Sequence, residues 1–250
     1  MNLRFLLPAL LVAAGAAYAQ APSTFDDCDQ VVLQHPNQER GYRCYIALAG
    51  RSGDWDEAAR RLDALVAVDP DNYLARLTLA SVEARRGGQN AELLYLESIA
   101  AFRDRRESDH EVAARLGYST FLSFRGRVGE SGEQLQEAMN TAVQAGDAVL
   151  AATVSVHLAR TEYYQALYEA AERRLLKVRE TLFRDGDGYQ QSLWLGVAGS
   201  VRWGMGRFPE AMNDFTQQAE LLASMDDPYE EAVARSNVAL LASIVHPPNQ

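Results

Sequence analysis

The sequence has few of the residues that most often carry chemistry or bind nucleic acid. Its 250 residues include two cysteines and four histidines, and Lys177 is the only lysine. There are 24 basic residues against 34 acidic ones, for a net charge of −10. Affinity for nucleic acid comes from neutralising phosphates, so we expect no nucleic-acid partner. A hydrophobic content of 48% excludes a disordered chain.

Catalytic and cofactor-binding motifs are missing as well. The histidines are scattered, and none stands in the H-E-x-x-H spacing of a zinc site. There is no nucleophile elbow, P-loop or dinucleotide fingerprint. Gly186 and Gly188 stand in a short acidic stretch that lacks the third acidic ligand and the closing Glu of a calcium loop. We therefore expect no enzyme activity, no cofactor and no metal site.

A long apolar run occurs only at the beginning of the sequence. Arg4 gives a basic start, an apolar run follows over residues 5–17, and Ala17-Tyr18-Ala19 forms an A-x-A cleavage site. These are the features of a secretory signal peptide, and the run is too short for a membrane-spanning helix. The sequence predicts a protein that is exported, periplasmic or secreted, once residues 1–19 are removed.

The two cysteines, Cys28 and Cys44, lie near the start of the exported chain. Cys28 falls in a helix-like segment over 23–34, and Cys44 falls in the next helix after a turn at 35–37. An even number of cysteines in an exported protein favours a disulfide. We expect this bond to attach the segment 20–38 to the rest of the chain, with two free buried thiols as the alternative.

An internal repeat dominates the rest of the sequence. A small residue followed four positions later by a bulky one recurs at Ala58, Ala91, Ser131, Ala171 and Ala211, and the successive intervals are 33, 40, 40 and 40. A second series of small residues stands eleven or twelve positions earlier, at Ala47, Ala80, Ser119, Ala159 and Gly199, and Ala239 continues it at the same later interval. Short turns are expected between the two series, at Gly53, Gly126, Ala166 and Gly206.

This pattern predicts an all-α solenoid. An antiparallel helix pair cannot bury its apolar face alone and stacks on its neighbours, with small residues where two backbones approach closely. No stretch alternates as a strand does, and proline is nearly absent from the expected helices. We expect about five and a half helix pairs over residues 39–245, followed by a tail at 246–250.

The repeated units resemble the tetratricopeptide repeat family. The best unit reads L-x-x-A-G, G-R-F and A-x-x-x-F between Leu195 and Phe215, and the first unit adds Trp55 and a terminating Pro70. The later units have a period of about 40 residues, which is compatible with extended helices. The resemblance covers residues 39 to the C-terminus and implies a non-catalytic module that binds a protein or peptide.

In such an array the first helix of each pair forms the inner wall, where a ligand would lie. Counting from the small residues places the following peptide-groove candidates on that wall: Arg40, Arg43, Arg85, His157, Arg160, Tyr163, Tyr164, Trp203 and Asn237. Arginines with aromatics suggest a groove for an extended peptide that carries an acidic group or a C-terminal carboxylate. The alternative is that the aromatics pack between repeats and the arginines are solvated.

The last expected helix, over residues 228–245, is apolar around much of its circumference. Such a helix is either covered by a partner or followed by more of the same protein beyond Gln250. Two functions therefore remain: a binding scaffold, or a regulatory segment of a larger exported protein. The family association suggests an effector domain of caspase-like protease or cyclase type for the second.

Overall fold

The computed structural model describes residues 23–225 and 228–245, and every regular element in these two ranges is a helix. The twelve helices are α1 (Phe25–Gln34), α2 (Glu39–Ser52), α3 (Trp55–Val68), α4 (Tyr73–Arg86), α5 (Ala91–Arg105), α6 (Ser108–Phe124), α7 (Val128–Ala145), α8 (Ala148–Tyr164), α9 (Tyr168–Asp185), α10 (Gly188–Gly204), α11 (Phe208–Ser224) and α12 (Pro228–Val245). The predicted all-α architecture is confirmed.

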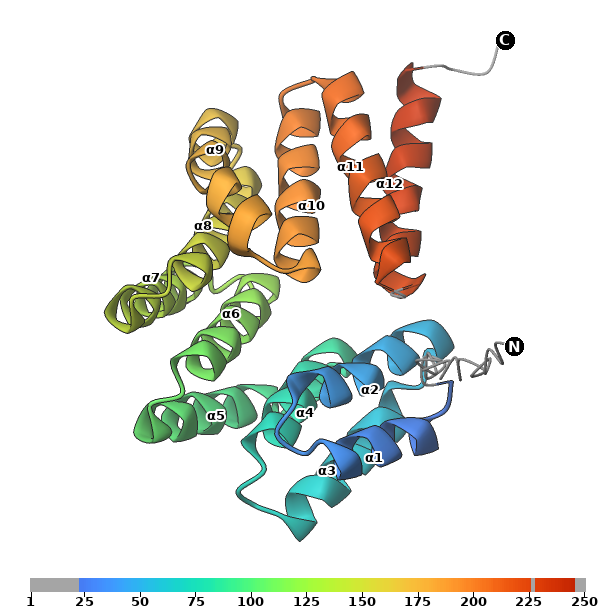
Figure 1. Ribbon diagram of the computed structural model, residues 1–250, viewed down its shortest axis with the longest axis vertical. Helices are drawn as coiled ribbons and strands as arrows, with labels where there is room; N and C mark the ends of the chain where they lie inside the picture. Colours follow the sequence, from blue (N-terminus) through green and yellow to red (C-terminus); the bar gives the residue numbers. More distant parts are fainter. Residues whose placement is uncertain (1–22, 226–227, 246–250) are drawn as a thin grey trace, which may run out of the picture.

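The helices form five consecutive pairs, from α2–α3 to α10–α11, and α12 is the first helix of a sixth. The pairs stack side by side into a curved array, with α1 to α4 at one end and α10 to α12 at the other (Figure 1). Buried apolar residues form successive clusters along the array, as expected when each pair packs on its neighbours. The predicted solenoid of about five and a half pairs is therefore confirmed.

The repeated small and bulky residues meet where two helices of a pair approach closely. A Cβ atom on Gly199 of α10 would lie 2.8 Å from the Phe215 ring of α11, and Phe215 is fully buried. One repeat earlier, Ala159 and Leu175 occupy the same positions and are also buried. A large ring at 215 thus requires glycine at 199, because a methyl group there would overpack the interface.

The acidic stretch around Gly186 joins two helices. The Asp187 side chain accepts a hydrogen bond of 2.9 Å from the backbone N–H of Gln190, and the Gln190 side-chain oxygen accepts one of 2.8 Å from the backbone N–H of Asp187. This capping box satisfies free N–H groups at the start of α10. Asp185 is paired with Arg184 at 2.8 Å. The carboxylates of this stretch are thus engaged in helix capping and an ion pair.

The turn between the two helices of a pair uses a left-handed residue. Gly126 and Gly206 have φ values of 75° and 75°, and Ala166, at the corresponding position of the fourth pair, has φ 59°. The left-handed conformation costs a residue with a Cβ atom about 1–2 kcal/mol, whereas glycine adopts it freely. Ala166 therefore keeps the geometry of the repeat at a local cost in backbone energy.

Replacing Ala166 with glycine is expected to raise the free energy of unfolding by about 1 kcal/mol, because the new residue relieves this strain. The matched control is Gly206→Ala, which should lower the free energy of unfolding by a similar amount. A Cβ atom at this position meets nothing within 4 Å, so only the backbone conformation is affected. Urea denaturation of both variants measures the two changes in stability. A destabilising Ala166→Gly change would contradict the argument.

A disulfide between Cys28 and Cys44 joins α1 to α2, which confirms the predicted pairing. The two Cα atoms are 5.7 Å apart, and Cys28 is fully buried. Arg61 of α3 adds ion pairs to Asp26 and Asp29 of α1. The short first helix is thus held by one covalent bond and by charges from the second helix of the first pair.

Removing the disulfide with Cys28→Ala and Cys44→Ala is expected to destabilise the N-terminal end by about 3 kcal/mol, the value for closing a loop of this size. The closed loop spans a sequence separation of 16 residues. Because most contacts in a stacked array are between neighbouring pairs, the effect should be local. Amide hydrogen exchange should accelerate in α1 and α2 and stay unchanged in α9. Uniform acceleration would show that the array unfolds as one unit.

The last helix, α12, packs one face on α11 and exposes another. Ala234 and Leu241 are buried, whereas Val233, Leu240 and Ile244 are 44%, 51% and 46% exposed. None of the helices in the described ranges is long and apolar enough to span a membrane. The predicted signal peptide and the tail at 246–250 lie outside the described residues.

Candidate functional site

A cavity of about 510 Å³ lies on the inside of the curved array. Its wall comes from the first helices of four pairs, α2, α6, α8 and α10, together with two residues of α11. Leu116, Leu150 and Leu193 provide apolar surface, and Arg43 and Arg160 provide positive charge. The volume is in the range of small-molecule or peptide side-chain pockets.

The curvature of the array brings the first pair back toward the fifth. The Arg43 guanidinium of α2 lies 4.4 Å from the centre of the Tyr189 ring of α10 and pairs with Glu39 at 3.1 Å. A guanidinium at this distance over an aromatic face is attracted by the ring's quadrupole. This contact joins α2 to α10, two helices far apart in the sequence that face each other across the inside of the curved array (Figure 1).

Arg160 is held in the wall by two neutral groups. One of its terminal nitrogens, Nη2, donates to Thr120 Oγ1 of α6 at 3.0 Å and lies 2.9 Å from His157 Nδ1. Thr120 and Arg160 are 40 residues apart and so occupy equivalent positions on neighbouring first helices. Because arginine can only donate, His157 Nδ1 accepts, which makes the imidazole neutral with its proton on Nε2.

The surroundings favour this neutral form. His157 is half-buried, and desolvation by the surrounding protein lowers the histidine's pKa well below its usual range. The positive charge of Arg160 lowers that pKa further. Burial also lowers the pKa of Arg160 from its usual value. The guanidinium nevertheless stays charged, because an arginine is not deprotonated in proteins.

His157 should therefore stay neutral as the pH falls through about 6.5, the usual pKa of a histidine. Below that pH the unfolded chain takes up a proton that the folded chain does not, so stability falls by at most about 1.4 kcal/mol per pH unit until the folded-state pKa is reached. NMR titration of the imidazole, with its signal assigned by loss in His157→Gln, checks this. The stability of the variant should also decline less steeply than that of the original protein as the pH falls. A titration midpoint of the imidazole near 6.5 would contradict the prediction.

Two of the nine groove candidates line the cavity, Arg43 and Arg160, and His157 contacts Arg160. Arg85 is exposed and lies 5.4 Å from the centre of the Trp55 ring on α3. The side chain of Arg40 is outside the described part of the structure.

The aromatic candidates lie toward the ends of the helices. Tyr163 packs at 5.4 Å from Tyr164 and 5.9 Å from Tyr168 of α9, measured between ring centres. Trp203 packs edge-on to Phe215 at 6.4 Å in the cluster between α10 and α11. The structure thus places Tyr163 and Trp203 in packing between helices, the alternative that the sequence left open. Asn237 is partly exposed on α12.

Several cavity residues were not among the predicted candidates. Leu193 and Thr153 lie one repeat apart on equivalent faces of α10 and α8, so the repeat could have identified them. Gln218 and Leu222 come from α11, the second helix of its pair. No sequence signal placed that helix at the cavity, because its position depends on the curvature of the whole array.

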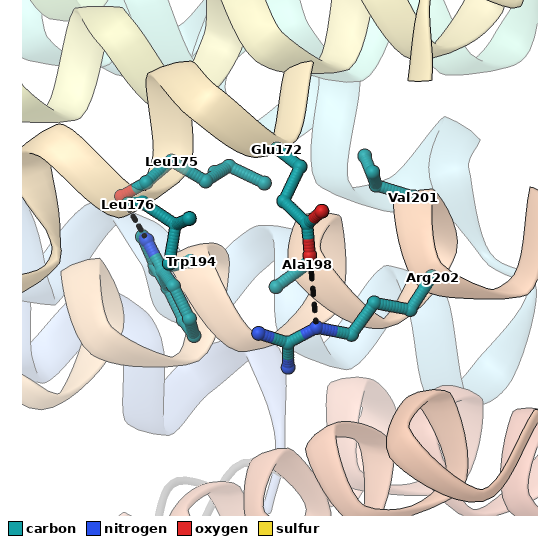
Figure 2. A pocket seen from close by; sticks show the side chains of 7 residues that line it. All are labelled: Glu172, Leu175, Leu176, Trp194, Ala198, Val201 and Arg202. Atoms are coloured by element: carbon teal, nitrogen blue, oxygen red, sulfur yellow. Dashed lines mark hydrogen bonds and ion pairs between the residues drawn. The ribbon is translucent and has the colours of Figure 1, made fainter. Parts of the chain in front are cut away.

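A second hollow lies between α9 and α10 (Figure 2). The Trp194 indole N–H donates to the Leu175 carbonyl at 2.9 Å, and Arg202 Nε lies 3.8 Å from the Glu172 carboxylate. Arg202 also pairs with the buried Asp214 of α11. The hollow has no space for a water-sized group. It is therefore part of the helix packing and not a binding site.

Comparison with solved structures supports the repeat fold. The chain is similar to a Signal Transduction ATPase with Numerous Domains (STAND) protein with a tetratricopeptide repeat sensor, from Pyrococcus horikoshii, with a TM-score of 0.56 and 14% sequence identity. The match covers 88% of this chain and 36% of that chain. No family model and no curated protein matches the sequence. At this identity the likeness shows a tetratricopeptide-like helical repeat fold.

Proposed function

We propose that this protein is a non-catalytic scaffold that binds an extended segment of a partner protein on the inner face of its helical array. The observation that carries the proposal is the cavity, where four separate helix pairs contribute side chains to one surface. Apolar side chains lie beside charged ones there, a mixture that suits a peptide better than a purely apolar ligand. Repeat arrays commonly use such concave surfaces for binding.

The proposal includes export of the protein to the periplasm or outside the cell. The features of residues 1–19 support it, and so does the disulfide, because such bonds persist in oxidising compartments.

The exposed face of α12 extends the proposed binding surface. Val233 stands one repeat after Leu193, and Leu240 stands one repeat after Ser200, which itself occupies the position of Arg160 on α8. Leu193 and Arg160 both line the cavity. The exposed apolar residues of α12 therefore continue the inner wall. A partner segment that follows the array would leave the cavity along them and would cover α12, which is one of the two alternatives that the sequence left open.

Selection from a random peptide library against the purified protein tests the scaffold. We expect binders whose affinity falls at least about 10-fold in Ala113→Trp, because the indole fills space that the peptide needs. Ala113 is partly exposed in the cavity wall. The matched control is Glu137→Trp, which adds the same side chain at an exposed position on α7. Calorimetric titration measures the affinities.

Two results would overturn this function. One is that selection yields no peptide that binds the protein. The other is that the selected peptides bind Ala113→Trp as well as they bind the original protein, which would place their site elsewhere.

A sensing role within a larger exported protein is a second candidate. The observation that favours it is the match to a protein that carries a tetratricopeptide repeat sensor and of which this chain covers 36%. Such a segment would act on an effector domain, for example of caspase-like protease or cyclase type. A sensor must change conformation when it binds, whereas a scaffold need not. Small-angle scattering with and without a selected peptide separates the two.

A further inference from the structure

Arg160 differs from the other arginines whose side chains are at least partly buried. Each of the others has a carboxylate within 4.0 Å: Arg43, Arg61, Arg76, Arg115, Arg127, Arg174, Arg202 and Arg207. Among the described residues, no carboxylate lies that close to Arg160. Partly buried charges are normally paired, so this guanidinium is an exception that requires a physical reason.

The contacts of Arg160 leave most of its donors free. Both of its hydrogen bonds, to Thr120 and His157, use the same nitrogen, Nη2. The other nitrogens, Nε and Nη1, have no hydrogen-bond partner among the described residues, yet neither is sealed from solvent. Arg160 lines the cavity, so a ligand there would lie beside a guanidinium that still has unused donors. A guanidinium that presents several N–H groups binds a carboxylate with good geometry.

The acidic residues of the cavity lie away from Arg160. Glu39, Asp109 and Asp187 are at the beginnings of α2, α6 and α10, in the first turn or at the N-cap. Arg160 is twelve residues after the first residue of α8, which is about 18 Å along a helix axis.

Two of these acidic residues, Glu39 and Asp187, already have partners. Glu39 pairs with Arg43 at 3.1 Å, and Asp187 caps α10. Asp109 lies 4.0 Å from the His110 ring. The first helices of successive pairs run in the same direction, so their beginnings lie at the same end of the cavity. That end carries the acidic residues, and Arg160 lies toward the other end. Leucine side chains line the wall as well, so a ligand there meets both charge and apolar surface.

We infer that Arg160 binds a carboxylate, namely an acidic side chain or the free C-terminus of a peptide that lies along the cavity. This inference rests on the proposed function, because it names the chemistry of the segment that the scaffold holds. Thr120 and the neutral His157 position the guanidinium without competing for its charge. A free small carboxylate presents the same chemistry from another source.

The test uses the peptides selected above and the variant Arg160→Gln, which keeps a hydrogen-bonding group and removes the charge. Each peptide is synthesised with its acidic group intact and with that group converted to an amide. We expect the acidic peptide to bind Arg160→Gln about 10-fold or more weakly than the original protein. The amide peptide should bind both proteins equally, and Arg160→Lys should restore part of the affinity.

Arg173→Gln is the control for a general loss of positive charge, because Arg173 is exposed on α9 and does not line the cavity. It should weaken binding less than Arg160→Gln. Thermal unfolding of each variant confirms that it is folded. Acidic and amide peptides that lose affinity equally in Arg160→Gln would overturn the inference while leaving the scaffold intact.

A direct titration separates failure of the inference from failure of the scaffold. N-acetylglutamate is added to the protein while the Arg160 Nε–H signal is followed by NMR, with N-acetylglutamine as the uncharged control. A saturable shift with N-acetylglutamate alone supports the carboxylate site. If no peptide is selected, the same shift would identify a small free carboxylate as the ligand. If neither compound shifts the signal and no selected peptide depends on Arg160, the inference is wrong.

Discussion

The close contact between a small residue and a bulky one within each helix pair is the constraint on which this structure depends. Where Gly199 meets Phe215, the backbones can approach only because glycine has no side chain. The same pairing at Ala159 and Leu175 gives the neighbouring pair a similar geometry. Similar pairs stack with similar offsets, so the array curves in a regular way. The inner face, and with it the cavity, is a consequence of this local packing.

Contacts between helices far apart in the sequence add to this curvature, because α2 meets both α10 and α12. Arg43 of the first pair lies over Tyr189 of the fifth, whereas in a simple solenoid each pair contacts only its neighbours. The two ends of the array are thus coupled through the cavity that they enclose. A ligand that changes the spacing between α2 and α10 would act on the contact directly, which gives the sensing candidate a structural route.

Most of the fold could be predicted from the sequence because its signals are local. The spacing of Ala58, Ala91 and Ser131 reflects contacts within one pair, and the turn at Gly206 reflects the backbone of one residue. The site was harder to predict. The repeat indicates which face of a helix points inward, but it does not show whether an aromatic such as Trp203 packs on a neighbour or faces the cavity. That depends on contacts between helices far apart in the sequence, which a periodic pattern does not record.

The position of Arg160 in the repeat does not call for an arginine. Thr120 and Ser200 occupy the equivalent positions on α6 and α10, so a small hydroxyl residue fits this place in the repeat. An arginine there loses part of its hydration and gains hydrogen bonds to two uncharged groups. These bonds do not offset the free-energy cost of partly burying a charge without an opposite charge beside it. Stability therefore does not explain the residue. A charge that is unfavourable in the free protein but open to the cavity is better explained by a ligand that completes it.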